Sequence, residues 1–205
     1  LGNAESGVGV FGGTLNRIGG LTTVERNIIA DNASGITLVG TSQNNTVIGN
    51  YIGVDVTGNV ALPNAGSGVV IANGASNNTI GGLVPGARNV LSGNTSFGVV
   101  ITSNGPLTSG NAIVGNYIGL GADGETALPS SRGIQQQTPG VTTTLIDSNV
   151  ISGHFYGMST SDATGSTITG NIIGLNAAGD SSVPNNVGLV VFSGSGTVIG
   201  GTTAA

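Results

Sequence analysis

Gly115-Asn116-Tyr117-Ile118-Gly119 holds one of six occurrences of a phrase in which asparagine precedes a β-forming residue and then isoleucine or leucine. The six are Asn27-Ile28-Ile29, Asn50-Tyr51-Ile52, Asn89-Val90-Leu91, Asn116-Tyr117-Ile118, Asn149-Val150-Ile151 and Asn171-Ile172-Ile173. A polar and an aliphatic residue that recur once per repeat are typical of a parallel β-solenoid, because each coil buries its apolar face on the next coil. The phrase therefore predicts an all-β solenoid with a ladder of stacked asparagines and an aliphatic column beside it.

Two further patterns complete each predicted coil. One begins with glycine and continues with alternating apolar residues, at Gly7, Gly35, Gly68, Gly98, Gly133, Gly157 and Gly188. The other is threonine followed by valine or isoleucine, as in Thr46-Val47, Thr79-Ile80, Thr167-Ile168 and Thr197-Val198. The glycines are spaced by 28, 33, 30, 35, 24 and 31 residues. We expect three short strands per coil and about six and a half coils, in a single domain over residues 1–205.

The corners of the coil differ between alternate repeats. Twelve-residue loops follow the asparagine phrase at 53–64, 119–130 and 174–185, whereas the intervening coils turn sharply, for example at Asp31-Asn32. The true repeat is therefore two coils. We expect the ladder asparagines to occupy corner positions, since asparagine tolerates left-handed backbone geometry and its amide can hydrogen-bond to the coils on either side.

Composition narrows the range of partners. The chain has 39 glycines, 38% hydrophobic and only 6% charged residues, a net charge of −5, and no lysine or cysteine. Four arginines do not supply the clustered positive charge that nucleic acids require. Since no apolar run approaches the roughly 20 residues of a membrane span, we expect no membrane insertion. A chain without lysine offers few sites to trypsin-like proteases, and this favours an extracellular or cell-surface location.

Three phrases carry a resemblance to a known family. They are Asn77-Asn78-Thr79-Ile80-Gly81-Gly82, the stretch from Gly86 to Asn94, and Gly115-Asn116-Tyr117-Ile118-Gly119. They resemble the right-handed parallel β-helix of the pectin-lyase-like type, and more narrowly the repeats of very large secreted or surface proteins of bacteria. The resemblance implies a right-handed coil. It leaves the function open, because the architecture carries lyases, hydrolases, epimerases, phage tailspikes, adhesins and passive stalks alike.

Residues able to support catalysis are few and scattered. No two of the nine acids are adjacent; Asp123 and Glu125, in a long loop, come closest and are weak candidates for a calcium site. We favour solvated loop acids over metal ligands, and expect no cofactor. The single histidine, His154, aligns with Asn32 and Asn94, so we expect it to replace a ladder asparagine rather than to act as an acid, a base or a metal ligand. No catalytic residue is assigned.

The outer surface offers better candidates for binding. The first apolar position of each asparagine phrase should point outward and form an exposed stripe of Ile28, Tyr51, Val90, Tyr117, Val150 and Ile172. Such a stripe suits another rod, a neighbouring domain or glycan stacking on the tyrosines, although cross-strand pairing explains it equally well. Arg26 and Arg88 occupy equivalent places two coils apart, and we expect their stems to cover the outside of the coil. Phe155, Tyr156 and Phe97 suggest a small aromatic platform, or simple packing under a corner.

Neither end of the chain has a recognisable cap, so we expect a fragment of a longer array or a subunit that stacks head to tail. The function expected from the sequence is a non-enzymatic, extracellular structural β-helix: a filament, surface layer, stalk or adhesin shaft. Its partners would be other copies, flanking repeats of the same protein, or glycans. The alternative is a β-helix that binds or cleaves carbohydrate.

Overall fold

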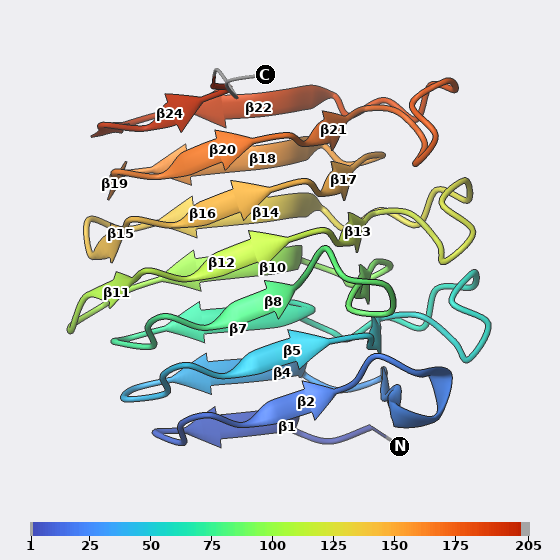
Figure 1. Cartoon of the computed structure of the whole chain (residues 1–205), viewed down its shortest axis with the longest axis horizontal. Helices are drawn as coiled ribbons and strands as arrows, with labels where there is room; N and C mark the ends of the chain where they lie inside the picture. Colours follow the sequence, from blue (N-terminus) through green and yellow to red (C-terminus); the bar gives the residue numbers. More distant parts are fainter. Residues whose placement is uncertain (1, 202–205) are drawn as a thin grey trace.

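The computed structural model describes residues 2–201, which form a right-handed parallel β-helix. The coils stack from the N-terminal coil at the bottom of Figure 1 to the C-terminal coil at the top. Sheet A contains β1 (Ser6–Phe11), β4 (Ser34–Val39), β7 (Val69–Ala72), β10 (Phe97–Thr102), β14 (Arg132–Gln137), β18 (Tyr156–Ser161) and β22 (Val187–Val191). The predicted all-β solenoid is confirmed.

Two more sheets complete the coil. Sheet B contains β2 (Arg17–Gly19), β5 (Thr46–Ile48), β8 (Thr79–Gly81), β12 (Ala112–Val114), β16 (Leu145–Asp147), β20 (Thr167–Thr169) and β24 (Val198–Ile199). Sheet C contains β3 (Ile28–Ile29), β6 (Tyr51–Ile52), β9 (Val90–Leu91), β13 (Tyr117–Ile118), β17 (Val150–Ile151) and β21 (Ile172–Ile173). Each strand of sheet C is thus the apolar pair that follows a ladder asparagine.

Three strands per coil is not the whole pattern. A fourth sheet, at the corner between sheets A and B, contains β11 (Thr108–Ser109), β15 (Val141–Thr142), β19 (Ala163–Thr164) and β23 (Gly194–Ser195). In the N-terminal half the same corner pairs through single bridges only, Thr14 with Gln43 and Gln43 with Ser76. The only helical turn in the described range is η1 (Thr23–Glu25), and no helix there is long and apolar enough to cross a membrane.

Stacked aliphatic columns fill the interior. In sheet C, Ile52, Leu91, Ile118 and Ile151 pair in register and are fully buried. Sheet B supplies a second column, listed from the N-terminal coil as Ile18, Val47, Ile80, Ile113, Ile146 and Ile168. Because strands of parallel sheets align identical positions, one aliphatic residue per coil is enough to build a continuous core.

The core becomes polar toward the C-terminal end of sheet A. Ile101 of β10 pairs with Gln136 of β14, which pairs with Thr160 of β18, and all three side chains are fully buried. The Gln136 amide and the Ser166 hydroxyl are 3.0 Å apart. The Thr160 hydroxyl has no hydrogen-bond partner among the described residues. A buried polar atom without a partner is costly, so this is a weak point of the core.

Asparagine ladders tie the coils together. Beside sheet C, each amide nitrogen donates to the amide oxygen of the next coil, at 2.9, 3.2, 2.9, 3.0 and 3.0 Å. The ladder runs through Asn27, Asn50, Asn89, Asn116, Asn149 and Asn171, as expected. Two more ladders exist. One precedes sheet A, through Asn3, Asn32, Asn64 and Asn94, and it contains the two asparagines with which His154 was aligned. The other precedes sheet B, through Asn16, Asn45, Asn78 and Asn111, and was not predicted.

The expected left-handed geometry lies one residue earlier than predicted. The ladder asparagines themselves are not left-handed; the residue before them is, as at Gly49 (φ 69°), Asn77 (φ 55°) and Ser148 (φ 56°). Most corners are therefore a left-handed residue followed by a ladder residue; the exceptions include Asn27, Asn64 and Asn89, which follow Arg26, Pro63 and Arg88. The left-handed residue turns the chain, and the next side chain points into the corner, where it satisfies the backbone groups that the turn leaves unpaired.

The long loops of alternate coils form a column of their own. Each loop closes on itself with an antiparallel bridge, Val54 to Ala61, Leu120 to Ala127 or Leu175 to Ser182. Although the loops belong to coils two apart, backbone N–H groups of Ala122 and Ala177 donate to carbonyl oxygens in the loop below, both at 2.9 Å. Figure 1 shows the loops projecting together from the side of the β-helix on which sheet C ends.

Candidate functional site

His154 occupies a ladder position before sheet A. Its Nδ1 accepts a hydrogen bond from the backbone N–H of Ser130 at 3.2 Å, and its Nε2 lies 3.1 Å from the carbonyl oxygen of Ile118. At the equivalent position of another coil, the Asn94 amide nitrogen likewise donates to a sheet C carbonyl oxygen in the coil below, that of Ile52. The neutral imidazole, protonated on Nε2, reproduces both roles of an amide. The expected replacement of a ladder asparagine is therefore seen in the geometry.

Burial fixes the protonation of this histidine. Only 2% of the residue is exposed, and desolvation lowers the pKa of His154 below its usual value, more strongly than the neighbouring backbone of Ser130 and Ile118 raises it. A neutral ring held by backbone groups on both nitrogens is suited to stabilising a corner. A general acid or base instead needs contact with a reacting group.

The loop acids are occupied by hydrogen bonds within the loop column. Asp123 Oδ1 accepts the backbone N–H groups of Glu125 and Thr126, and Oδ2 accepts the Thr126 hydroxyl. Slight burial would raise the pKa of Asp123, but these hydrogen bonds outweigh it and lower the pKa. Glu125 contacts the amide of Asn176, in the next long loop, at 2.9 and 3.0 Å.

The two carboxylates proposed as calcium ligands thus make contacts in different directions. Asp123 closes the turn of its own loop, and Glu125 reaches the loop above it. Among residues 2–201 there is no group of three or more histidine, aspartate or glutamate side chains placed to hold a metal ion. The geometry of both acids matches loop stacking.

Arg26 and Arg88 each stack on a tyrosine. The guanidinium carbon lies 4.0 Å from the ring centroid in both pairs, Arg26 on Tyr51 and Arg88 on Tyr117. Each arginine also donates Nε–H to a backbone carbonyl, of Gly49 or Gly115, at 3.2 Å. Cation–π contact and a hydrogen bond together orient the guanidinium plane. The stems cover the coil as expected, and the stacking on tyrosine was not predicted.

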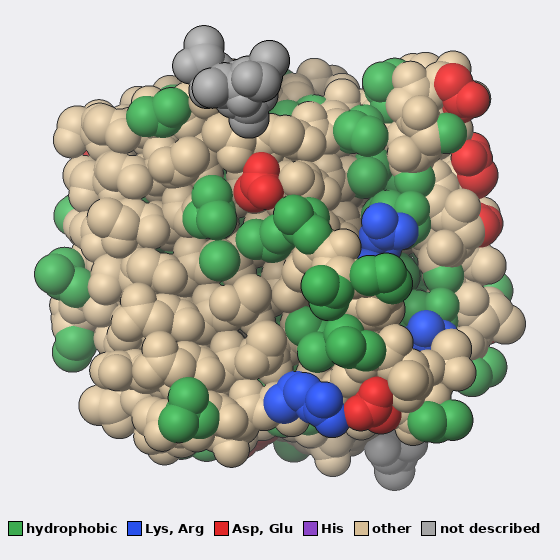
Figure 2. Space-filling model, in the orientation of Figure 1, with side chains coloured by type: hydrophobic (Ala, Val, Ile, Leu, Met, Phe, Trp, Pro, Cys, Tyr) green, Lys and Arg blue, Asp and Glu red, His purple; other side chains and the backbone are tan. Residues whose placement is uncertain are grey.

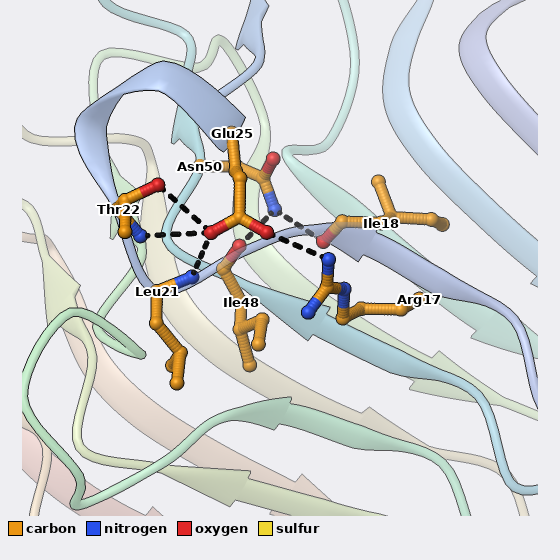
Figure 3. A network of polar contacts seen from close by, with 7 residues as sticks. All are labelled: Arg17, Ile18, Leu21, Thr22, Glu25, Ile48 and Asn50. Atoms are coloured by element: carbon orange, nitrogen blue, oxygen red, sulfur yellow. Dashed lines mark hydrogen bonds and ion pairs between the residues drawn. The ribbon is translucent and has the colours of Figure 1, made fainter.

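The loop that carries Arg26 is held by a compact polar network (Figure 3). One carboxylate oxygen of Glu25 accepts from Arg17 at 2.7 Å, and the other accepts the backbone N–H groups of Leu21 and Thr22 and the Thr22 hydroxyl. The Thr22 hydroxyl and N–H, followed by Arg17, lower the pKa of Glu25. Arg17 and Glu25 form the single ion pair found in residues 2–201.

Both arginine–tyrosine pairs line one groove, here called the arginine groove. Its volume is about 210 Å³, and its lining includes Arg26, Arg88, Tyr51, Tyr117, Val90 and Ala122. The floor is sheet C, where Val90 pairs with Tyr51 on one side and with Tyr117 on the other. The loops that precede sheet C form one wall, and the long-loop column, through Ala122, forms the other.

The predicted exposed stripe is only partly exposed. Ile28 is 40% exposed and Tyr51, Tyr117 and Ile172 are half-buried, but Val90 and Val150 are buried, at 3% and 6% exposure. Each buried valine pairs with the bulkier Tyr117 in sheet C. The expectation of a continuous exposed apolar stripe is therefore wrong. The stripe is instead the floor of a groove whose accessible groups are arginines and tyrosine edges.

A second cluster of aromatic residues lies on the outside of sheet A. Phe155 and Tyr156 meet edge to face with centroids 4.8 Å apart, and Phe192 meets Tyr156 at 6.0 Å. Arg132 lies between Tyr156 and Phe97, 5.2 and 5.9 Å from their centroids. Phe155 and Phe192 are 55% and 56% exposed. The predicted platform thus gains Phe192, whose proximity sequence alone did not indicate.

No family model matches the chain, and no curated protein matches it either.

Proposed function

We propose that this chain is a structural segment of an extracellular, repetitive β-helix, a shaft or layer element rather than an enzyme. The continuity of its internal contacts carries the proposal. Aliphatic columns and asparagine ladders run from coil to coil. The residues best able to act as acids or bases, His154 and the loop acids, instead stabilise corners and loops. A rod of this kind would provide length and stiffness, the role expected of the pectin-lyase-like repeats of large surface proteins that the sequence resembles.

The partner proposed for the end faces is another β-helical coil, from a further copy or from flanking repeats. Val8 and Val10 in the first coil and Leu189 in the last are only partly buried against the core, and Ile199 is 58% exposed. A groove of about 220 Å³ between Ile173, Leu189 and Ile199 opens at the C-terminal coil. A stacked coil would bury these side chains in the way that every internal coil buries its neighbour's.

Negative-stain electron microscopy over a concentration series tests this function. Rods or unbranched fibres one coil wide support a structural role. The proposal fails if the purified chain cleaves a polysaccharide and H154N or D123N abolishes that activity, because both residues would then act in catalysis. H154N keeps the ladder hydrogen bonds, so loss of activity in that variant would not be explained by unfolding.

Carbohydrate binding is the second candidate, favoured by the exposed aromatic cluster on sheet A. Edge-to-face rings beside an arginine present apolar faces of the kind on which sugars stack. Glycan-array binding that is lost in an F155A/F192A double variant, while thermal stability is retained, would support it. The exposed Leu15, 80% accessible and in the first coil, supplies a control, L15A.

A further inference from the structure

The arginines of the groove have oriented guanidinium groups and no acidic partner in the part of the chain that the structure describes. Arg26 and Arg88 stack on tyrosine and donate Nε–H to carbonyl oxygens. Within residues 2–201 the one carboxylate bonded to an arginine is that of Glu25, which pairs with Arg17. Arg88 is exposed and Arg26 half-buried. The terminal nitrogens of both arginines are thus available to an incoming anionic group.

The long-loop column carries the opposite charge. Glu125 and Asp180 occupy equivalent positions of successive long loops, and Asn176 contacts both of them. Both acids are exposed. Figure 2 shows red acidic side chains gathered along the outer edge of the loops, and blue side chains further in, toward sheet C. The tips of the loop column are therefore a row of negative charge on a chain of net charge −5.

The two charged features have different spacings. Arg26 and Arg88 lie two coils apart, which at about 4.8 Å per coil separates them by about 9.6 Å. The carboxylates of Glu125 and Asp180 both contact Nδ2 of Asn176, at 2.9 and 2.8 Å, so they lie close together between two successive loops. The loop tips of one rod therefore present two neighbouring negative charges, and the groove of a second rod offers one arginine for each of them.

We propose that the arginine groove binds the acidic loop tips of a second copy of this chain, so that rods associate laterally through Arg26 and Arg88 on one copy and Glu125 and Asp180 on the other. The proposal rests on the structural role proposed above and names the lateral partner. Since the groove and the tips are different surfaces, the contact is heterologous and each copy keeps one free groove and one free row of tips. Repetition of the contact generates a row of parallel rods, the arrangement of a layer.

The strength of the contact comes from two ion pairs formed in one interface. A single exposed ion pair is weak and screened by salt. Two pairs reinforce one another, since formation of the first pair brings the second pair of charges close together.

Sedimentation velocity over a range of protein concentrations, at low and high ionic strength, tests the proposal. We expect the wild type to associate at low salt and to dissociate at high salt. The double variant R26Q/R88Q is expected to weaken association at least tenfold, whereas R132Q, which removes one positive charge from the outside of sheet A, leaves it unchanged. Association that is equal in wild type and R26Q/R88Q, or a wild type that stays monomeric at low salt, overturns the proposal.

Charge reversal separates loss of the interface from loss of folding. R26E/R88E makes the groove negative, and E125R/D180R makes the tips positive, so each variant alone should be monomeric. An equimolar mixture offers negative grooves to positive tips and should associate. A mixture that stays monomeric while both variants keep the wild-type thermal midpoint refutes the pairing. Short rods or end-to-end fibres in R26Q/R88Q would leave the structural role intact, so the two proposals can fail separately.

Discussion

Replacing His154 probes whether a histidine can act as a ladder asparagine. In H154A the Ser130 N–H loses its partner in a corner that is closed to solvent, whereas the Ile118 carbonyl oxygen still accepts the backbone N–H of Ser152. An unpaired buried group costs about 1–3 kcal/mol, and we expect a loss of that size in the free energy of unfolding, before the cavity is counted. In H154N one amide donates and accepts in the same places, and we expect a loss below about 1 kcal/mol.

The H154N variant also isolates the contribution of His154 to the pH dependence of stability. Because the pKa of His154 is lowered in the folded state, the unfolded state binds more protons below its own pKa of about 6.5. The stabilising contribution is complete above that pKa and is lost as the pH falls toward the folded pKa, with a limiting slope of about 1.4 kcal/mol per pH unit. H154N has no titrating group here and should lack this component.

Urea unfolding of wild type, H154N and H154A, followed by circular dichroism at pH values from about 7.5 to about 5, measures both effects. The carboxylates titrate identically in all three variants, so the difference between wild type and H154N reports on the histidine alone. The ladder role is refuted if H154N is destabilised as strongly as H154A. The assigned protonation is refuted if wild type and H154N lose stability in parallel over this pH range.

Three further substitutions test individual features. N116A removes a buried ladder amide and leaves several groups unpaired, so it should cost about 3 kcal/mol or more in urea unfolding, whereas N104A, at an exposed asparagine, should change stability by less than about 0.5 kcal/mol. T160V replaces a fully buried hydroxyl that has no partner in the described structure with a methyl group, and we expect the thermal midpoint to rise; a fall would show that the hydroxyl is solvated inside the core. G86A places a Cβ 1.9 Å from a backbone oxygen at a φ of 85° and should lower the thermal midpoint by destabilising the loop under the arginine groove. G105A, with open space around it, should not, and equal thermal midpoints of the two variants would contradict the loop packing.

The fold could be read from the sequence because the solenoid repeats one simple pattern. Position within the coil determines whether a side chain faces the core, and alignment of coils therefore predicted the aliphatic column, the ladder beside sheet C and the ladder position of His154. The same alignment contained the ladder before sheet B, since Asn45 and Asn78 each precede a threonine phrase, but that ladder was not predicted. A left-handed residue followed by asparagine marks it, as at Asn44-Asn45 and Asn77-Asn78.

The candidate site was less accessible to sequence reasoning, because it depends on contacts between features in different coils. Alternation predicted that Val90 points outward, and it does, yet its bulky neighbours in sheet C cover it. Arg88 was placed correctly on the outside of the coil, but nothing in a linear pattern indicates that its guanidinium lies over Tyr117 of the next coil. The stacking of long loops two coils apart likewise depends on the three-dimensional stagger of the loops.

The ladders also make the two ends of the rod electrically different. In every asparagine pair beside sheet C the amide nitrogen points to the following coil and the oxygen to the preceding one. Aligned amide dipoles in a hydrogen-bonded chain polarise one another. The ladder therefore carries a net dipole, with its negative pole at the first coil and its positive pole at the last. A coil added at either end meets a field of defined sign, and growth by addition of coils would be directional in the manner of a polar filament, with a head that cannot substitute for its tail.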